Sequence, residues 1–476
     1  MSKQINGSTP SASASLRIVR ERTACILLIS LSLAAVLIVP VGSAQLAPQD
    51  PATTTAAARN AALIAATQEV LKETSDVRQL SIIRPVQSST QSRAEIERAI
   101  MKNLDEEITP ADMHAAEVTL KKLGLAPPDF QYRALMVRLL TEQVAGYYEP
   151  KTRQFYLADW IDIDGQKPIM AHELTHALQD QHFNLRRFNH WPKGDSDAEL
   201  AAHALIEGDA TLAMAMYVAS NPFRALTFLK SMGAMGITTE ELDKAPRALR
   251  ETLLFPYQEG MNWTRALFKQ GSWSEVSQAF TTLPQSTEQI LHADKYFTHE
   301  APVKVTVPDL TSLLNARSQK SQVRGQRPAR ASGVQATASW KKLASDVNGE
   351  WGFYLILDEF LKSPAESRAA AAGWAGDRTA VYESPKGDVL YVSLSTWDTE
   401  NDAREFFDAY VKRTELRYPG ATSIDQAPDS PSPRRSKSFS TSEGSVVIQL
   451  HGLRAVILEG APGNAASNSL IRMLTN

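Results

Sequence analysis

Residues 172–176 read His-Glu-Leu-Thr-His, a pattern that could bind a metal ion and use it to activate water. On a helix, residues i and i+4 lie about 40° apart around the axis, so His172 and His176 would point the same way and could bind one Zn²⁺. Glu173 would project toward a water at that metal, take its proton and pass it to a leaving amine. These residues predict metal-assisted hydrolysis.

The surrounding residues favour the helix that this chemistry needs. No Pro or Gly occurs from Ile169 to Phe183, and we expect a helix from about Lys167 to Gln181. Its apolar face would consist of Ala171, Leu174, Ala177 and Leu178. The alternative is a surface helix on which the histidines and the glutamate are incidental.

Catalytic zinc usually has three protein ligands, so a third must come from elsewhere in the chain. The downstream candidates are His182, His190, His203, Glu207 and Asp209. Glu207 is favoured because it lies mid-way along a predicted helix from about Asp195 to Val218, among small and apolar residues, where a carboxylate needs a partner. His182 follows His176 by six residues and lies on another face. An ordinary salt bridge of Glu207, and His203 as the ligand, are the alternatives.

The sequence HELTHA with a downstream helical Glu resembles the gluzincin group of zinc metallopeptidases, the thermolysin-like enzymes of the peptidase MA clan. The resemblance covers about residues 140–215. It implies a zincin-like fold in which His172, His176 and Glu207 bind Zn²⁺ and Glu173 is the general base. The chain as a whole looks most like an uncharacterised family of exported bacterial proteins related to gluzincins.

The chain also departs from the characterised gluzincins. The 31-residue step from His176 to Glu207 is longer than in the thermolysin or aminopeptidase N types, and no GxMEN motif is present. Thr211 stands where thermolysin-like enzymes carry an Asp four residues after the ligand Glu. Asp180, four residues after His176, does match the helix of those enzymes.

Three side chains could stabilise the oxyanion of a tetrahedral intermediate besides the metal. They are Tyr257, His292 and Tyr296, each of a type that more often packs or caps a helix. In zincins the substrate pairs with an edge strand beside the metal helix, and Gln154–Ala158 is the expected strand here.

Two acidic residues and one glycine are expected to support the metal ligands. Asp180 and Asp209 are candidates for hydrogen bonds to the ligand histidines. Gly208, beside Glu207, would let its helix approach the metal helix closely.

Residues 1–44 have the order of a signal peptide or signal anchor. Three arginines precede an uncharged stretch, Thr23–Val41, and Gly42-Ser43-Ala44 offers a cleavage site. We expect cleavage after Ala44. An uncleaved membrane anchor is the alternative, because about 18 apolar residues can span a bilayer. Either way the body of the protein is expected to be exported, in the periplasm or outside the cell.

The composition excludes several classes of protein. The chain has 50 basic and 53 acidic residues, so its net charge of −3 does not fit a basic nucleic-acid binder. The single cysteine, Cys25, excludes an intramolecular disulfide, an iron–sulfur cluster and a Cys-rich zinc site. We expect a peptide or protein substrate, no nucleic acid, and membrane association only through the N-terminal apolar segment. No pattern indicates an oligomeric state.

The expected fold class is α+β, with most helices before residue 310. Val144–Tyr148 and Gln154–Ala158 predict a hairpin, and Gln426–Glu443 is Ser/Pro-rich and expected to be irregular. After the signal segment we expect a flexible spacer (45–58), a helical zincin-like metallopeptidase domain with a short β-sheet (59–310), a basic low-complexity linker (311–339) and a C-terminal α+β domain (340–476).

These features predict an exported zinc-dependent metallopeptidase that hydrolyses peptide bonds with zinc-activated water and Glu173 as general base. The alternative is a membrane-anchored, non-catalytic binding or assembly protein on a zincin-like scaffold. Glu173 favours the enzyme, because a scaffold has no need of it. No pro-segment stands out, although residues 45 to about 140 could act as one.

Overall fold

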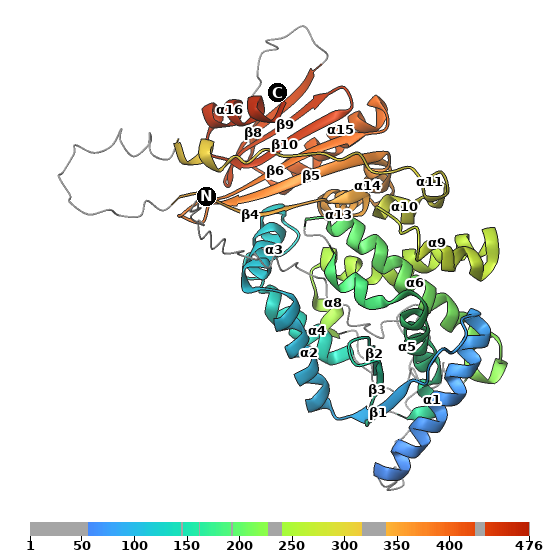
Figure 1. Ribbon diagram of the computed structural model, residues 1–476. Coiled ribbons are helices and arrows are strands. Elements are labelled where there is room, and N and C mark those ends of the chain that lie inside the picture. Colours follow the sequence, from blue (N-terminus) through green and yellow to red (C-terminus); the bar gives the residue numbers. More distant parts are fainter. Residues whose placement is uncertain are drawn as a thin grey trace, which may run out of the picture.

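The structure, a computed structural model, describes residues 56–143, 146–160, 162–191, 194–226, 240–316, 339–423 and 434–475. Over these residues the fold is α+β, as expected, with a helical part beside a seven-stranded sheet (Figure 1). The predicted signal segment lies outside the described residues. Within them, no helix is both long enough and apolar enough to cross a membrane.

The helical part contains most of the chain before residue 300. Its helices are α1 (Ala56–Arg78), α2 (Arg93–Glu107), α3 (Pro110–Leu123), α4 (Tyr132–Gln143), α5 (Ile163–Phe183), the 3-10 helix η2 (Leu185–His190), α6 (Ser196–Ala219), α8 (Glu240–Lys244), α9 (Arg247–Ala279), α10 (Thr287–Leu291) and α11 (Ala293–Phe297). Helix α1 begins inside the stretch expected to be a spacer, so that prediction was wrong for residues 56–58.

Local sequence signals account for several helix ends. Ser92 and Glu95 form a capping box at the start of α2. The Thr109 side chain accepts from the N–H of Asp112 at the start of α3, and Gly124, at φ 73°, ends that helix. Helix α4 begins at Tyr132, after a turn in which the N–H of Phe130 donates to the carbonyl oxygen of Pro127.

A small sheet lies beside α5 and has the strand order β1-β3-β2. Strands β2 (Gly146–Glu149) and β3 (Gln154–Ala158) form the predicted antiparallel hairpin, whereas β1 (Gln87–Gln91) pairs parallel to β3. Strand β3 is therefore the central strand, and the expectation that it is an edge strand was wrong. The polar sequence of β1 gave no alternating apolar signal by which it could be predicted.

The C-terminal part is a seven-stranded antiparallel sheet with helices on both faces. Its strands, in the order β4-β5-β6-β10-β9-β8-β7, are β4 (Lys341–Asp346), β5 (Trp374–Glu383), β6 (Val389–Trp397), β10 (Arg454–Ala461), β9 (Gly444–His451), β8 (Arg434–Thr441) and β7 (Thr422–Ser423). The helices are α13 (Gly349–Leu361), α14 (Pro364–Ala371), α15 (Glu400–Arg417) and α16 (Asn464–Thr475). Strand β8 corrects the expected irregular stretch up to Glu443. Its pairing with β9 was hard to foresee, since few of its side chains are apolar.

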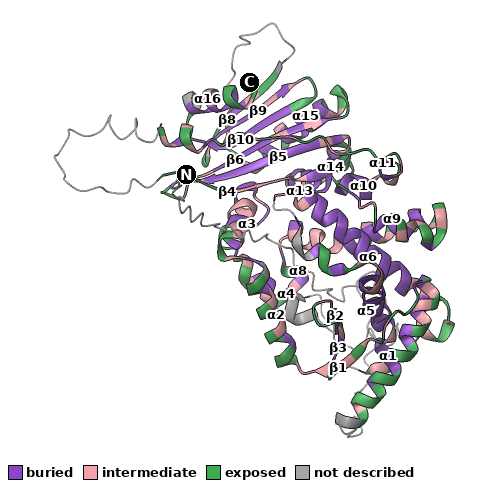
Figure 2. Ribbon diagram, viewed as in Figure 1, coloured by how far each residue is buried: buried purple, intermediate pink, exposed green. Residues whose placement is uncertain are grey.

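The two parts share one hydrophobic core. Leu200 and Phe255 of the helical part belong to the same buried cluster as Trp351, Phe406 and Ile457 of the C-terminal part. Figure 2 shows buried residues running from α5 and α6 through α13 into the sheet. The other face of the sheet is covered by α16 and by the segment that contains Leu310 and Leu314, on both sides of the expected domain boundary at 311.

Candidate metal centre

Helix α5 carries the His-Glu-x-x-His residues, and its position buries them. The helix packs against α1, α6 and β2, and its residues from Gly165 to Asp180 are almost all buried. It begins four residues earlier than predicted, where the Asp162 side chain accepts from the N–H of Gly165. His172 and Glu173 have no exposed surface and His176 has 3%. The surface-helix alternative is thereby excluded.

Glu207 of α6 meets both histidines. Its Oε2 lies 3.1 Å from Nε2 of His172 and 3.4 Å from Nε2 of His176, and the two Nε2 atoms are 3.1 Å apart. Donor atoms around a tetrahedral zinc, with bonds of about 2.0–2.2 Å, lie about 3.3–3.5 Å from one another. The three atoms thus match one face of a zinc tetrahedron to within a few tenths of an ångström.

The charges of the three residues also fit a cation. Burial alone would raise the pKa of Glu207, but His176 and His172 outweigh it and hold this pKa well below its ordinary value. Burial would lower the pKa of His176, but the Glu207 carboxylate raises it to about 9. A positive charge is therefore stabilised at this place. A bound Zn²⁺ would supply that charge, with both imidazoles neutral as metal ligands must be.

The two histidines differ in what their other ring nitrogen contacts. Nδ1 of His176 lies 2.8 Å from Oε1 of Gln179, one turn further along α5. An amide oxygen only accepts, so Nδ1 carries the hydrogen and Nε2 is free to bind a metal. Among the described residues, Nδ1 of His172 has no hydrogen-bond partner.

Glu173 is held by strand β2. The N–H of Tyr148 donates to Oε2 of Glu173 at 2.9 Å, and burial raises the pKa of this carboxyl, against the nearby His172 and His176. The Tyr148 hydroxyl donates to Oδ2 of Asp180 at 3.0 Å. Asp180 therefore positions Tyr148 and accepts from Arg84, instead of bonding a ligand histidine as expected.

Tyr257 of α9 reaches the centre. Its ring stacks on His172, with ring centroids 6.1 Å apart. Burial raises its pKa well above the ordinary value, and the Glu207 carboxylate, to which its hydroxyl donates, adds to that effect. The phenol therefore stays protonated beside the two carboxylates of Glu207 and Glu173. Tyr257 is the one oxyanion candidate that the structure brings to this place.

The other two oxyanion candidates lie elsewhere, which corrects the expectation for His292. Nε2 of His292 is 2.9 Å from Oε1 of Glu350, at the junction with α13. The Tyr296 hydroxyl donates to the carbonyl oxygen of Thr282. Both side chains therefore hold helices of the protein together.

The remaining ligand candidates are also placed away from the three donor atoms. His182 bonds the carbonyl oxygen of Ser81, and the side chain of His190 lies outside the described residues. His203 is buried, which lowers its pKa to about 4, but it does not belong to the group formed by His172, His176 and Glu207. Asp209 accepts from Gln179 and pairs with Arg78.

Sequence reasoning missed three contributors, namely Gln179, Arg78 and Tyr148. Gln179 had a usable signal, because residues i and i+3 of a helix are neighbours and His176 needs an acceptor for its second ring nitrogen. Arg78 comes from a helix far earlier in the chain. Tyr148 acts on Glu173 through its backbone, which no side-chain pattern reveals.

A second group of acidic residues does not resemble a metal site. Oxygen atoms of Glu288, Glu300 and Asp398 lie close together, but Nζ of Lys295 is 2.7, 2.7 and 2.6 Å from them. The ammonium group of Lys295 already lies within hydrogen-bond distance of all three carboxylates. It therefore gives no reason to expect a second ion.

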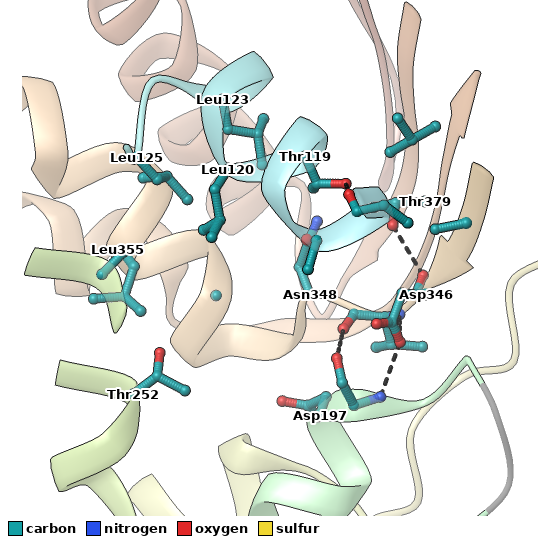
Figure 3. A pocket seen from close by; sticks show the side chains of 18 of the residues that line it. Thr119, Leu120, Leu123, Leu125, Asp197, Thr252, Asp346, Asn348, Leu355 and Thr379 are labelled. Carbon is teal, nitrogen blue, oxygen red and sulfur yellow. Dashed lines mark hydrogen bonds between the residues drawn. The ribbon is translucent and has the colours of Figure 1, made fainter. Parts of the chain in front are cut away.

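A cavity elsewhere in the structure is lined by no residue of the metal centre. It has a volume of about 630 Å³ and lies between α3, α9, α13 and β4. Figure 3 shows leucines such as Leu123 and Leu355 on one side and Asp197 and Asp346 on the other. These carboxylates accept hydrogen bonds from Thr287 and from the N–H of Ser196, so they hold α6 to α10 and to β4.

Comparison with known proteins covers the C-terminal part alone. Residues 337–470 match a family described as "Domain of unknown function (DUF8575)". No curated protein and no solved structure matches the chain. The histidine pair and Glu207 lie outside the matched residues, so the case for their chemistry rests on their geometry.

Proposed function

We propose that the protein is an exported, zinc-dependent peptidase with a zincin-like fold. The observation that carries the proposal is the convergence of Nε2 of His172, Nε2 of His176 and Oε2 of Glu207, all within 3.4 Å of one another, beside the buried carboxyl of Glu173. Two imidazoles and one carboxylate are a common ligand set of catalytic zinc.

Zn²⁺ bound by these three residues would lower the pKa of a water molecule and polarise a substrate carbonyl. Glu173 has the position and the raised pKa of a general base that takes the proton of the attacking water and returns it to the leaving amine. The protonated hydroxyl of Tyr257 would donate to the oxyanion that develops at the carbonyl.

Strand β2 is the strand that would pair with an extended substrate. We assign this role to β2 and not to β3, because β3 has neighbouring strands on both sides. Among the described strands, β2 pairs with β3 on one side, and its Tyr148 N–H points to Glu173 on the other. A peptide that added to this edge would present its backbone next to Glu173.

The test compares the purified full chain with a Glu173→Gln variant in zinc content and in hydrolysis of a mixed set of labelled peptides. We expect one zinc per chain in both proteins and a loss of hydrolysis in the variant on the order of 10²–10⁴-fold. Glu350→Gln is the matched control, since Glu350 is also buried and pairs with His292 outside the centre. Zinc binding without hydrolysis in the wild type would favour the binding or assembly protein.

A further inference from the structure

A chain of buried polar side chains runs from α1 to the ligand His176. Arg78, at the end of α1, forms an ion pair with Asp209 of α6, and both side chains are fully buried. The other oxygen of Asp209 accepts from Nε2 of Gln179 at 2.9 Å, and Oε1 of Gln179 accepts from Nδ1 of His176 at 2.8 Å. Three helices therefore meet in one hydrogen-bonded series.

The series fixes which way the Gln179 amide faces. Its nitrogen donates to two acceptors, Oδ2 of Asp209 and the carbonyl oxygen of Ile206 at 3.0 Å. A reversed amide would place its oxygen against both of these oxygens and its N–H₂ against His176. His176 would then carry its hydrogen on Nε2, the atom that faces Glu207, and could not bind a metal there.

Arg78 in turn determines which oxygen of Asp209 is available to Gln179. Its guanidinium also lies within 3.3 Å of the Ser277 hydroxyl and over the ring of Trp273, so it is fixed from the side of α9 as well. It holds one oxygen of Asp209 and leaves the other to Gln179. The positive charge of Arg78 is thereby separated from His176 by two side chains, Asp209 and Gln179.

We propose that Arg78 and Asp209 are positioning residues that set the zinc affinity of the centre through Gln179, by selecting the ring form of His176 that binds metal. The inference rests on the proposed metal centre, but not on peptidase activity. The proposal also means that α1 contributes to metal binding through Arg78, which argues against residues 56–78 being a removable pro-segment.

An asparagine at position 209 gives the sharpest test. In Asp209→Asn, Arg78 claims the single amide oxygen, so the N–H₂ of the asparagine turns toward Gln179 and favours the reversed amide. Zinc binding should weaken by about 10–100-fold, the usual cost of losing a partner of a metal ligand. Adding Arg78→Met should free the asparagine oxygen for Gln179 and restore affinity to within about threefold of wild type.

The readout is the zinc dissociation constant of the purified full chain, measured by competition with a coloured chelator. Glu459→Gln is the matched control, because Glu459 and Arg413 form another fully buried ion pair, in the C-terminal sheet. We expect its zinc affinity to stay within about twofold of wild type. If Asp209→Asn does not fold, Gln179→Met removes the same acceptor without touching the ion pair and should weaken binding by about 10-fold or more.

The proposal is overturned if Asp209→Asn, or Gln179→Met in its place, binds zinc within twofold of wild type. It is also overturned if the Arg78→Met/Asp209→Asn double variant binds zinc more weakly than Asp209→Asn alone. The loss of packing at two positions would explain that result without any selection of the His176 ring form. A wild-type chain that binds no zinc contradicts the metal centre itself, and so separates the failure of the proposed function from that of the positioning role.

Discussion

Gly208 of α6 and Gly260 of α9 touch backbone to backbone. A methyl group placed on Gly208 would lie 2.3 Å from the carbonyl group of Gly260, and one placed on Gly260 would lie 2.3 Å from the carbonyl oxygen of Ala204. Glu207 immediately precedes one glycine, and Tyr257 lies one turn before the other. The crossing therefore sets the distance between the ligand carboxylate and the phenol.

Gly208→Ala should destabilise the protein, although alanine is the better helix former by about 1 kcal/mol. The added methyl group meets backbone atoms that cannot turn aside, and overpacking of this kind costs about 1–3 kcal/mol or more. Denaturant unfolding measures the change. Gly420→Ala is the control, since a methyl group placed on Gly420 would meet no atom within 4 Å beyond its chain neighbours. A Gly208→Ala protein as stable as wild type would contradict the close crossing.

Tyr257→Phe should separate catalysis from metal binding. The phenol is buried and stays protonated, so it can donate to an oxyanion, and loss of one such donor costs about 10²–10³-fold in kcat. Zinc content should stay at the wild-type level, because the three ligand atoms are untouched. Steady-state kinetics on a labelled peptide and metal analysis of the same sample give both numbers. Unchanged kcat would mean that another group stabilises the oxyanion.

Local sequence patterns predicted the helix and the hairpin of the site better than the contacts that these elements make with distant segments. Helix α5 was predicted from the spacing of His172 and His176, from the lack of Pro and Gly after Ile169 and from the apolar face. The structure confirms that helix. The hairpin was also predicted, since its two strands lie a few positions apart in the sequence.

Contacts between distant segments could not be predicted in this way. Strand β1 is polar, so its parallel pairing with β3, which makes β3 central, left no trace in the sequence. Gly208 was expected to face the metal helix, but it lies one residue, or about 100°, around the helix from Glu207 and contacts Gly260 instead. His292 met Glu350 because the helical and C-terminal parts share a core.

Stability should fall as the pH rises from about 4 to 7, in part because of Asp377 on β5. This buried carboxyl accepts from the N–H groups of Asn348 and Gly349 and from the indole of Trp374, with no cation among these donors. Burial raises its pKa to about 7, whereas the unfolded value is about 3.9. Between these values the folded state holds a proton that the unfolded state has lost, so the free energy of unfolding decreases with pH.

Asp377→Asn mimics the protonated acid and should flatten this decrease, by on the order of 3 kcal/mol between pH 4 and pH 7. The measurement is urea unfolding at a series of pH values for both proteins. Asp408→Asn, at an exposed ion pair with Arg435, is the control and should keep the wild-type slope. If the free energy of unfolding changed equally with pH in wild type and Asp377→Asn, the Asp377 carboxyl would be ionised over this whole pH range.

The choice of Glu207 over His203 as third ligand has the most direct test. Both residues lie on α6 one turn apart and both are buried, so they are matched in position. Glu207 lies within 3.4 Å of both ligand imidazoles, and its carboxylate offsets the charge of a bound Zn²⁺. His203 is neutral at pH 7, since burial lowers its pKa to about 4.

Glu207→Ala should therefore weaken zinc binding by on the order of 10³-fold, because it removes both a ligand atom and a negative charge. Glu207→Gln keeps an oxygen but not the charge and should fall between Glu207→Ala and wild type. His203→Ala should stay within about threefold of wild type. Chelator competition on the three variants ranks them. The opposite order, with zinc lost from His203→Ala and kept by Glu207→Ala, would move the third ligand to His203 and end the resemblance to the gluzincins.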